Sequence, residues 1–176
     1  LGEVTYLLES GSDRIGALDF QAASDVYVTR GGDHPGLDEL AEAARRIQVG
    51  EPLNAELEAA LLHGTSVGGA RPKALVDDGD RKLIAKFSSE TDLYPVVQGE
   101  FVAMTLAQRC GLDVAAVELT RAAGRYALLV ERFDRESAGR RRALASAFML
   151  GRESRREPAL KPAPSRATMF SMFCGA

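Results

Sequence analysis

A ten-residue stretch, Gly64–Lys73 with the sequence GTSVGGARPK, constrains the fold of this chain more than any other feature. Its three glycines permit backbone conformations that are closed to other residues, and they let main-chain N–H groups approach a ligand closely. The hydroxyls and the cations Arg71 and Lys73 favour an anion, of which phosphate is the obvious candidate. Gly/Ser clusters also form plain turns, so the flanking sequence has to decide between these two interpretations.

The sequence before this loop predicts two helices. Apolar residues recur at helical spacing from Leu37, and Gly50 and Pro52 end that helix. A shorter helix over residues 55–62, with Asn54 as its N-cap, leads into the loop.

The sequence after the loop predicts a β-hairpin. Two short apolar runs, at 74–76 and 82–87, flank the turn Asp77-Asp78-Gly79-Asp80, and Asp-Gly between such runs is a strong hairpin signal. The glycine loop therefore opens a strand. A Walker loop and a Rossmann fingerprint both open a helix, so neither fits.

The strongest helical pattern runs from Val96 to Cys110 and is closed by Gly111. Glu100 lies in this helix among apolar neighbours, where a carboxylate needs a cation or hydrogen-bond donors. The helix is apolar on two sides and is therefore expected to be largely buried. One apolar row contains Val97, Phe101 and Met104, and the other contains Val102, Leu106 and Cys110.

Further strands are expected on both sides of these elements. Residues 114–119 and 126–130 predict a second hairpin with a turn at 122–125. Near the start of the chain, the pattern over 4–8 predicts a strand, and the alternation over 14–20 predicts short strands of a small sheet.

The composition limits the class of protein. The 176 residues are 45% hydrophobic and 27% charged, as in one soluble domain or two small lobes. No run is apolar enough to cross a membrane, and Cys110 and Cys174 are too few for a disulfide framework, so a cytoplasmic protein is expected. Only His34 and His63 could supply imidazoles, and no CxxC or HExxH spacing occurs, so no metal site is expected.

Charge is divided unevenly along the chain. Residues 1–134 carry 13 Lys/Arg and 22 Asp/Glu, a net charge of −9, whereas residues 135–176 carry 9 and 3, a net charge of +6. A basic end can contact nucleic acid. No aromatic residues interleave with Arg140-Arg141-Arg142, however, and such runs are commonly solvated tails, so direct nucleic-acid binding is disfavoured.

Lys86 ends the second strand of the first hairpin, and Glu100 follows fourteen residues later on the predicted helix. Two such ions can neutralise each other across a small sheet, although each alone could also be an exposed or purely structural ion. The order of glycine loop, strand, strand lysine, helix glutamate and hairpin is that of a protein-kinase N-lobe. There, the loop covers the phosphates, the lysine holds the α- and β-phosphates, and the glutamate orients the lysine.

Four motifs resemble, in order and spacing, those of the HipA-type serine/threonine kinases, the toxin components of bacterial toxin–antitoxin modules. They are SVGGARPK at 66–73, IAKF at 84–87, GEF at 99–101 with LAQRCGL at 106–112, and VERFDR at 130–135. RIGAL at 14–18 also resembles the end of that family's N-terminal subdomain. The resemblance covers about residues 1–150.

The fold implied by the resemblance is α+β: a kinase-like N-lobe, made of a small antiparallel sheet with a buried helix, preceded by part of the N-terminal subdomain. Three segments follow from it. Residues 1–50 would be the remnant of that subdomain plus a helix, and residues 51–134 the N-lobe with phosphate loop and hinge. Residues 135–176 would be the start of the C-lobe and an irregular basic tail.

The resemblance also implies roles for single residues. Ser66 would be the loop serine that such kinases autophosphorylate, which would place negative charge where the ATP phosphates bind. Val76 and Ala85 would lie over the purine ring, and the main chain of Glu131 and Phe133 would bind adenine as the hinge. The implied nucleotide-binding residues are Ser66, Val67, Gly68, Gly69, Ala70, Lys73, Lys86, Glu100, Glu131 and Phe133.

The implied cofactors of the intact family are ATP and Mg²⁺. Its partners are a HipB-like antitoxin and a protein substrate of the translation machinery. A kinase also needs a catalytic Asp, an Asn and a metal-binding Asp after the hinge. In this chain Asp134 is the last aspartate and Asn54 the only asparagine.

We therefore expect an N-lobe fragment without phosphotransfer activity, with no catalytic residue and no metal ligand. The start at Leu1 and the unfamiliar sequence after residue 158 suggest a piece of a longer protein that ends early, as a frameshift would produce. The alternative is a non-catalytic module that docks an antitoxin or completes a split kinase. A nucleic-acid binder acting through the basic tail ranks last.

Overall fold

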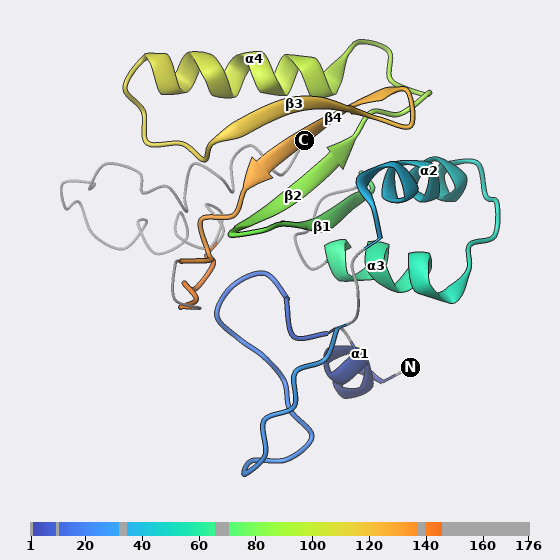
Figure 1. Ribbon diagram of the computed structural model, residues 1–176, viewed down its shortest axis with the longest axis vertical. Coiled ribbons are helices and arrows are strands. Elements are labelled where there is room, and N and C mark those ends of the chain that lie inside the picture. Colours follow the sequence, from blue (N-terminus) through green and yellow to red (C-terminus); the bar gives the residue numbers. More distant parts are fainter. Residues whose placement is uncertain (1, 10, 32–34, 66–70, 137–139, 146–176) are drawn as a thin grey trace, which may run out of the picture.

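The computed structural model describes residues 2–9, 11–31, 35–65, 71–136 and 140–145. Within these ranges the chain forms a four-stranded antiparallel sheet with the strand order β1-β2-β4-β3, and helices cover both of its faces (Figure 1). The α+β class predicted from the sequence is confirmed. The elements are α1 (Glu3–Glu9), α2 (Leu37–Gln48), α3 (Ala55–Thr65), β1 (Lys73–Asp78), β2 (Arg81–Phe87), α4 (Val96–Arg109), β3 (Val117–Ala122) and β4 (Arg125–Glu131).

Both predicted hairpins are present, and each is closed by residues with a positive φ angle. Gly79 has a φ of 60° in the turn between β1 and β2. Ala123 and Gly124 have φ angles of 48° and 77° between β3 and β4. In the β3–β4 turn both central residues have a positive φ, which gives a turn whose twist matches that of the strands it joins.

Alternation along the strands divides the core into two hydrophobic clusters, one on each face of the sheet. The α4-side cluster places the side chains of the sheet against Val97 and Met104 of α4. The α2-side cluster places the opposite side chains against Leu40 and the alanines of α2 and against Leu61 of α3. Buried strand residues of the first cluster are Leu75, Ile84, Leu128 and Val130; those of the second are Ala74, Leu83, Ala85, Phe87, Ala122, Ala127 and Leu129.

The end of helix α3 lies very close to the start of strand β1. The Asn54 side chain accepts a hydrogen bond from the N–H of Leu57 at 2.9 Å, which confirms the predicted N-cap. At the other end, a Cβ atom added to Gly64 would lie 2.1 Å from the carbonyl oxygen of Lys73. Only glycine allows this approach, so the end of α3 and the start of β1 lie side by side.

The prediction of strands near the start of the chain was wrong. Residues Glu3–Glu9 form helix α1, and residues 11–31 contain neither helix nor strand. The run VTYLL has the composition of a strand, but a strand needs a neighbour to pair with, and the sheet provides none there. Side chains hold residues 11–31 instead: the amide of Gln21 bonds both the N–H and the carbonyl of Val28, at 3.0 and 3.2 Å.

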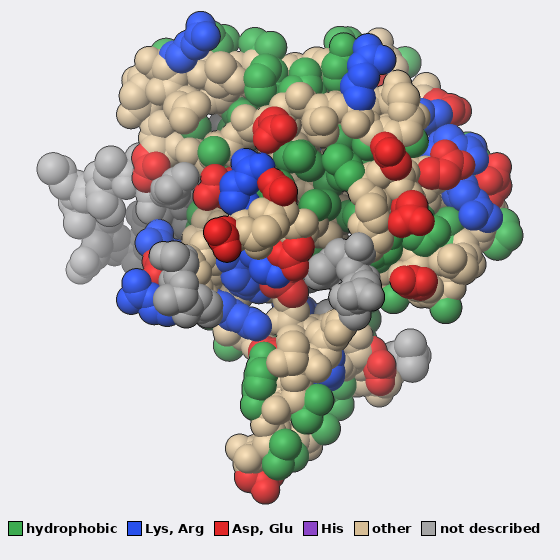
Figure 2. Space-filling view, in the orientation of Figure 1, with side chains coloured by type: hydrophobic (Ala, Val, Ile, Leu, Met, Phe, Trp, Pro, Cys, Tyr) green, Lys and Arg blue, Asp and Glu red, His purple; other side chains and the backbone are tan. Residues whose placement is uncertain are grey.

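Residues 11–31 form an arm that projects away from the sheet (Figure 1). Hydrophobic side chains gather on this arm, as the lower part of Figure 2 shows. They are exposed by 55–71% and belong to Leu18, Val26, Tyr27 and Val28.

Helix α4 has the predicted position but only one buried face. Val97 and Met104 are buried at 2% and 3% exposure, whereas Val102 and Leu106 are 53% and 54% exposed. The prediction of burial on two sides was therefore wrong for the second apolar row. The sheet covers one side of the helix, and no described element covers the other (Figure 1). No described helix is long and apolar enough to span a membrane.

Candidate functional site

Lys86 on β2 and Glu100 on α4 form an ion pair, as the sequence predicts. The distance from Nζ to Oε1 is 2.5 Å. The side chains are 9% and 18% exposed, so the pair is almost removed from water. Charges in such a setting are stable only together, because an ion left alone would lose its hydration without compensation.

Lys73 lies directly across the β1–β2 ladder from Lys86. Side chains of facing residues point to the same side of a sheet, so both ammonium groups belong to the α4 side. Lys73 is 5% exposed, and its Nζ donates to the carbonyl oxygen of Arg71 at 2.9 Å. Lys73 and the Lys86–Glu100 pair therefore lie on the same face of the sheet, at the strand that the glycine loop opens.

The exit of the glycine loop is tied to the segment that precedes α4. Arg71 pairs with Asp92 at 2.6 Å, and Asp92 also accepts the N–H of Ser89 at 3.0 Å. Hydrogen bonding by Arg71 lowers the pKa of Asp92 despite partial burial, so this carboxylate is ionised at neutral pH. The Arg71–Asp92 ion pair thus connects the exit of the loop to the segment before α4, the helix that carries Glu100.

Two residues expected over the purine ring lie on the face of the sheet opposite to Lys86. Val76 and Ala85 point to the α2 side, where Ala85 is fully buried in the α2-side cluster. Lys86 points to the α4 side, because consecutive residues of a strand alternate. Leu75 and Ile84 share the face of Lys86. Leu75 lies two residues from Lys73 and Ile84 lies two residues from Lys86, and this spacing of two is the sequence signal that places them on that face.

The other predicted nucleotide-binding residues belong to the glycine loop and to the segment at the end of β4. Ser66, Val67, Gly68, Gly69 and Ala70 fall outside the described residues. Glu131 ends β4, and its N–H donates to the carbonyl oxygen of Ala116 at 2.9 Å. Phe133 is 9% exposed and packs in the α4-side cluster. A pocket of about 380 Å³ opens next to Glu131, Arg132 and Phe133.

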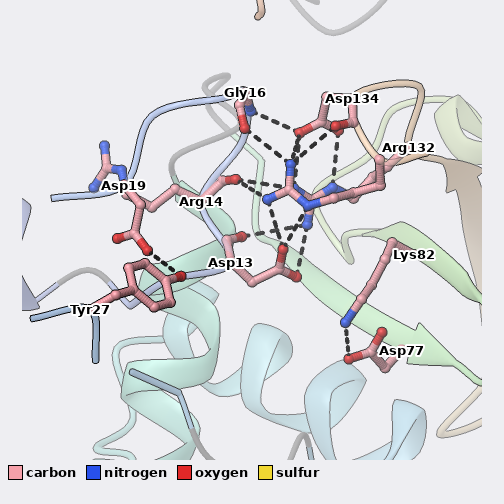
Figure 3. A network of polar contacts seen from close by, with 10 residues as sticks. Asp13, Arg14, Gly16, Asp19, Tyr27, Asp77, Lys82, Arg132 and Asp134 are labelled. Atoms are coloured by element: carbon pink, nitrogen blue, oxygen red, sulfur yellow. Dashed lines mark hydrogen bonds and ion pairs between the residues drawn. The ribbon is translucent and has the colours of Figure 1, made fainter. Parts of the chain in front are cut away.

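Sequence reasoning missed a buried ionic network immediately after β4 (Figure 3). The Arg132 side chain is completely buried, and Asp134 is 1% exposed. Arg132 donates to both carboxylate oxygens of Asp134, at 3.1 and 3.0 Å, and to Asp13 at 2.9 Å. Asp134 also accepts the N–H of Gly16 at 2.7 Å.

Arg135 completes what we call the Asp134 network, formed by Asp13, Arg132, Asp134 and Arg135 with the main chain of residues 14–16. It contacts Asp134 at 2.7 Å and Asp13 at 2.8 Å. Burial alone would raise the pKa of Asp134, but hydrogen bonds and charge from Arg132 outweigh burial and place the pKa below its ordinary value of 3.8. No periodicity joins positions 13 and 134, so the sequence carries no signal for this contact.

Comparison with known proteins gives two matches. The model of the HipA-like C-terminal domain family matches residues 65–170, which is more than half of the chain. Among solved structures, one described as the Shewanella oneidensis MR-1 toxin–antitoxin system HipA, HipB and operator DNA complex contains a similar chain, with 27% identity and a TM-score of 0.49. The match covers 82% of the present chain and 39% of that one. No curated protein sequence matches significantly.

Proposed function

The chain belongs to the HipA-like family, and from this premise we propose that it is the nucleotide-binding N-lobe of an ATP-dependent protein kinase that phosphorylates Ser/Thr. The observation that carries this proposal is the ion pair between Lys86 and Glu100. It joins the second strand after the glycine loop to a helix packed on the same face of the sheet. A kinase N-lobe uses such a pair to hold its phosphate-binding lysine.

The residues around this pair suit the phosphates of ATP. Lys73 and Lys86 face the same side from adjacent strands, and Arg71 stands at the exit of the loop. We assign phosphate contacts to these lysines and to the loop residues 66–70, with Glu100 orienting Lys86. Charge-assisted hydrogen bonds of this kind are stronger than neutral ones. Phosphorylation of Ser66 would then repel the nucleotide and act as an off-switch.

The adenine would bind at the hinge, the main chain of residues 131–133. The N–H groups of Glu131 and Arg132 already donate to the carbonyl oxygens of Ala116 and Lys82, so we assign adenine recognition to other main-chain groups of this segment. Leu75 and Ile84, on the face of Lys86, replace Val76 and Ala85 as the apolar residues nearest the nucleotide. The division of the chain at residues 50 and 134 belongs to the same proposal.

The described residues do not fit a Mg²⁺ site. No group of three His, Cys, Asp or Glu side chains that could hold a metal occurs within the described ranges. We therefore assign no metal ligand and no step through a metal.

A binding titration tests the proposal. The chain is titrated with ADP by calorimetry, and so are the variants Lys86→Met and Lys82→Met. Lys82 is the matched control, because it lies on the same strand and face and pairs with Asp77 away from the loop. We expect Lys86→Met to weaken ADP binding at least tenfold, about 1.4 kcal/mol, and Lys82→Met to leave it unchanged. Equal affinity for ADP in both variants would contradict the proposal.

A non-catalytic binding module is the second candidate, and the exposed apolar arm favours it. Leu18, Val26, Tyr27 and Val28 leave a hydrophobic surface that a partner could cover. A HipB-like antitoxin is the partner to test, by sedimentation of the mixture. A complex that forms with wild type and is lost in Tyr27→Ser would support this function, and two separate species would reject it.

A further inference from the structure

We propose that residues 12–16 form a strap that the Asp134 carboxylate fastens to the end of β4, and that Asp134 is thereby a positioning residue for the hinge main chain, residues 131–133. The strap itself is independent of any ligand. Its effect on adenine binding rests on the function proposed above.

Several hydrogen-bond donors converge on the carboxylate of Asp134. Asp134 accepts hydrogen bonds from Arg132, from Arg135 and from the N–H of Gly16, all between 2.7 and 3.1 Å. Asp13, on the strap, accepts from the same two arginines. Two carboxylates thus balance two guanidinium groups, one carboxylate from each segment. If either segment moved away, the buried guanidinium groups would lose one of their two carboxylate partners.

Arg132 lies inside the hinge and is bonded to both the sheet and the strap. Its main-chain N–H donates to the carbonyl oxygen of Lys82 on β2 at 2.9 Å. Its guanidinium donates to the carbonyl oxygen of Arg14 on the strap at 3.1 Å. The hinge is therefore held from two sides, by the sheet and by the strap. A rigid planar guanidinium that is fully buried allows little freedom to the backbone that carries it.

The strap also makes an apolar contact beside these ions. Ile15 of the strap packs against the α4-side cluster, which contains Phe133 and Val130. Gly16 has a φ of 84°, a conformation that L side chains rarely adopt, and this places its N–H on Asp134. The strap therefore contacts the hinge through both charge and packing.

The test compares Asp134→Asn with Asp92→Asn in the complete chain. Asp92 is the matched control: its side chain is 9% exposed, and it pairs with Arg71, which belongs to neither the strap nor the hinge. Amide hydrogen exchange is measured for all segments. We expect Asp134→Asn to speed exchange at least tenfold at Gly16 and Arg132, with little change in α2 and α4. We expect Asp92→Asn to leave exchange at both sites as in wild type.

Two ligands separate positioning from simple loss of stability. Adenosine probes the hinge alone, and tripolyphosphate probes the lysines alone. We expect Asp134→Asn to weaken adenosine at least tenfold and to leave tripolyphosphate unchanged, whereas Lys86→Met has the opposite effect. Unchanged exchange at Gly16 and Arg132 in Asp134→Asn would overturn the strap. Faster exchange there with wild-type adenosine affinity would overturn the positioning role.

Two further outcomes are also decisive. If wild type binds neither ligand, the proposed function fails and the positioning role fails with it, while exchange still decides the strap. If Asp134→Asn does not fold, Asp13→Asn replaces it. The Asp13 side chain is 29% exposed, and the bonds of Asp134 to Arg132 and Arg135 do not involve it. We then expect faster exchange at Arg132, and no change there would overturn the strap.

Discussion

At the residue scale, Gly64 has the least room for a side chain among the glycines that the structure describes. A Cβ atom there would meet the carbonyl oxygen of Lys73 at 2.1 Å, and backbone cannot move aside as a flexible side chain can. We expect Gly64→Ala to lower the free energy of unfolding by roughly 2 kcal/mol or more, within the range of severe core overpacking. Urea denaturation followed by circular dichroism measures the change.

Gly99 is the matched control for this substitution. It lies inside α4, and a Cβ atom added to it would meet nothing within 4 Å. Gly99→Ala should be neutral or should stabilise the chain by up to about 1 kcal/mol, because alanine favours a helix interior over glycine. Equal stability losses in Gly64→Ala and Gly99→Ala would refute the close approach of α3 to β1.

At the element scale, α4 has one face that holds the fold and one that does not. Met104 is 3% exposed, whereas Leu106 is 54% exposed on the same helix. We expect Met104→Ala to cost about 2–4 kcal/mol and Leu106→Ala less than about 1 kcal/mol. Chemical denaturation of the two variants makes the comparison, and the reverse order would place the wrong face of α4 against the sheet.

The junction of β4 with the strap should make stability depend on pH. The pKa of Asp134 lies below 3.8 in the folded chain. Its stabilising contribution is therefore complete above the ordinary pKa and is lost as the pH falls through the lowered pKa. We expect the free energy of unfolding to fall on acidification from about pH 5. The fall should be shallower in Asp134→Asn, because asparagine does not titrate.

Other carboxyl groups leave a residual slope in that variant. The pKa values of Asp19, Asp92, Glu42 and Glu136 are also lowered in the folded chain. Denaturation curves at several pH values below 5 test the prediction. Parallel pH profiles for wild type and Asp134→Asn would mean that Asp134 is not the main acid-sensitive group.

At the scale of the whole molecule, one sheet serves two hydrophobic clusters. Every strand except β3 contributes fully buried residues to the α2 side and to the α4 side alike, so the layers should unfold together. The proposed nucleotide site uses the α4 side only. The α2 side supplies the support that fixes the strands carrying Lys73 and Lys86.

The purified chain should not transfer phosphate, because no aspartate or asparagine follows Asp134 to act on a substrate hydroxyl. We expect no labelled product after incubation with radioactive ATP and a generic protein substrate. Lys86→Met is the control for contaminating kinases. Label that appears with wild type and disappears with Lys86→Met would show that the chain is active by itself.

Short-range patterns predicted most of the sheet and the central pair. Alternation and Asp-Gly or Ala-Gly turns located both hairpins, and apolar flanks singled out Lys86 and Glu100 as ions in need of each other. These signals work because strand pairing and charge burial leave their mark within a few residues. The same alternation places Ile84 on the face of Lys86, as the structure has it, whereas the expectation for Ala85 came from the family resemblance.

Contacts between distant segments could not be predicted in this way. Asp13 and Arg132 lie 119 positions apart and meet only because the arm returns to the end of β4. The first segment was predicted as a strand from its β-branched residues, whereas pairing partners decide the outcome. The outer row of α4 is apolar in sequence but exposed, because helix periodicity shows that a face is apolar and not what covers it.

The contact between Gly64 and Lys73 has a consequence for how the family could vary. Gly64 at the end of α3 and Lys73 at the start of β1 are held next to each other by the scaffold. A change in the length of chain between two points that are already close together costs little, because each doubling of loop length costs only about 0.6 kcal/mol. Relatives could therefore differ in length between these two positions without a change in the scaffold.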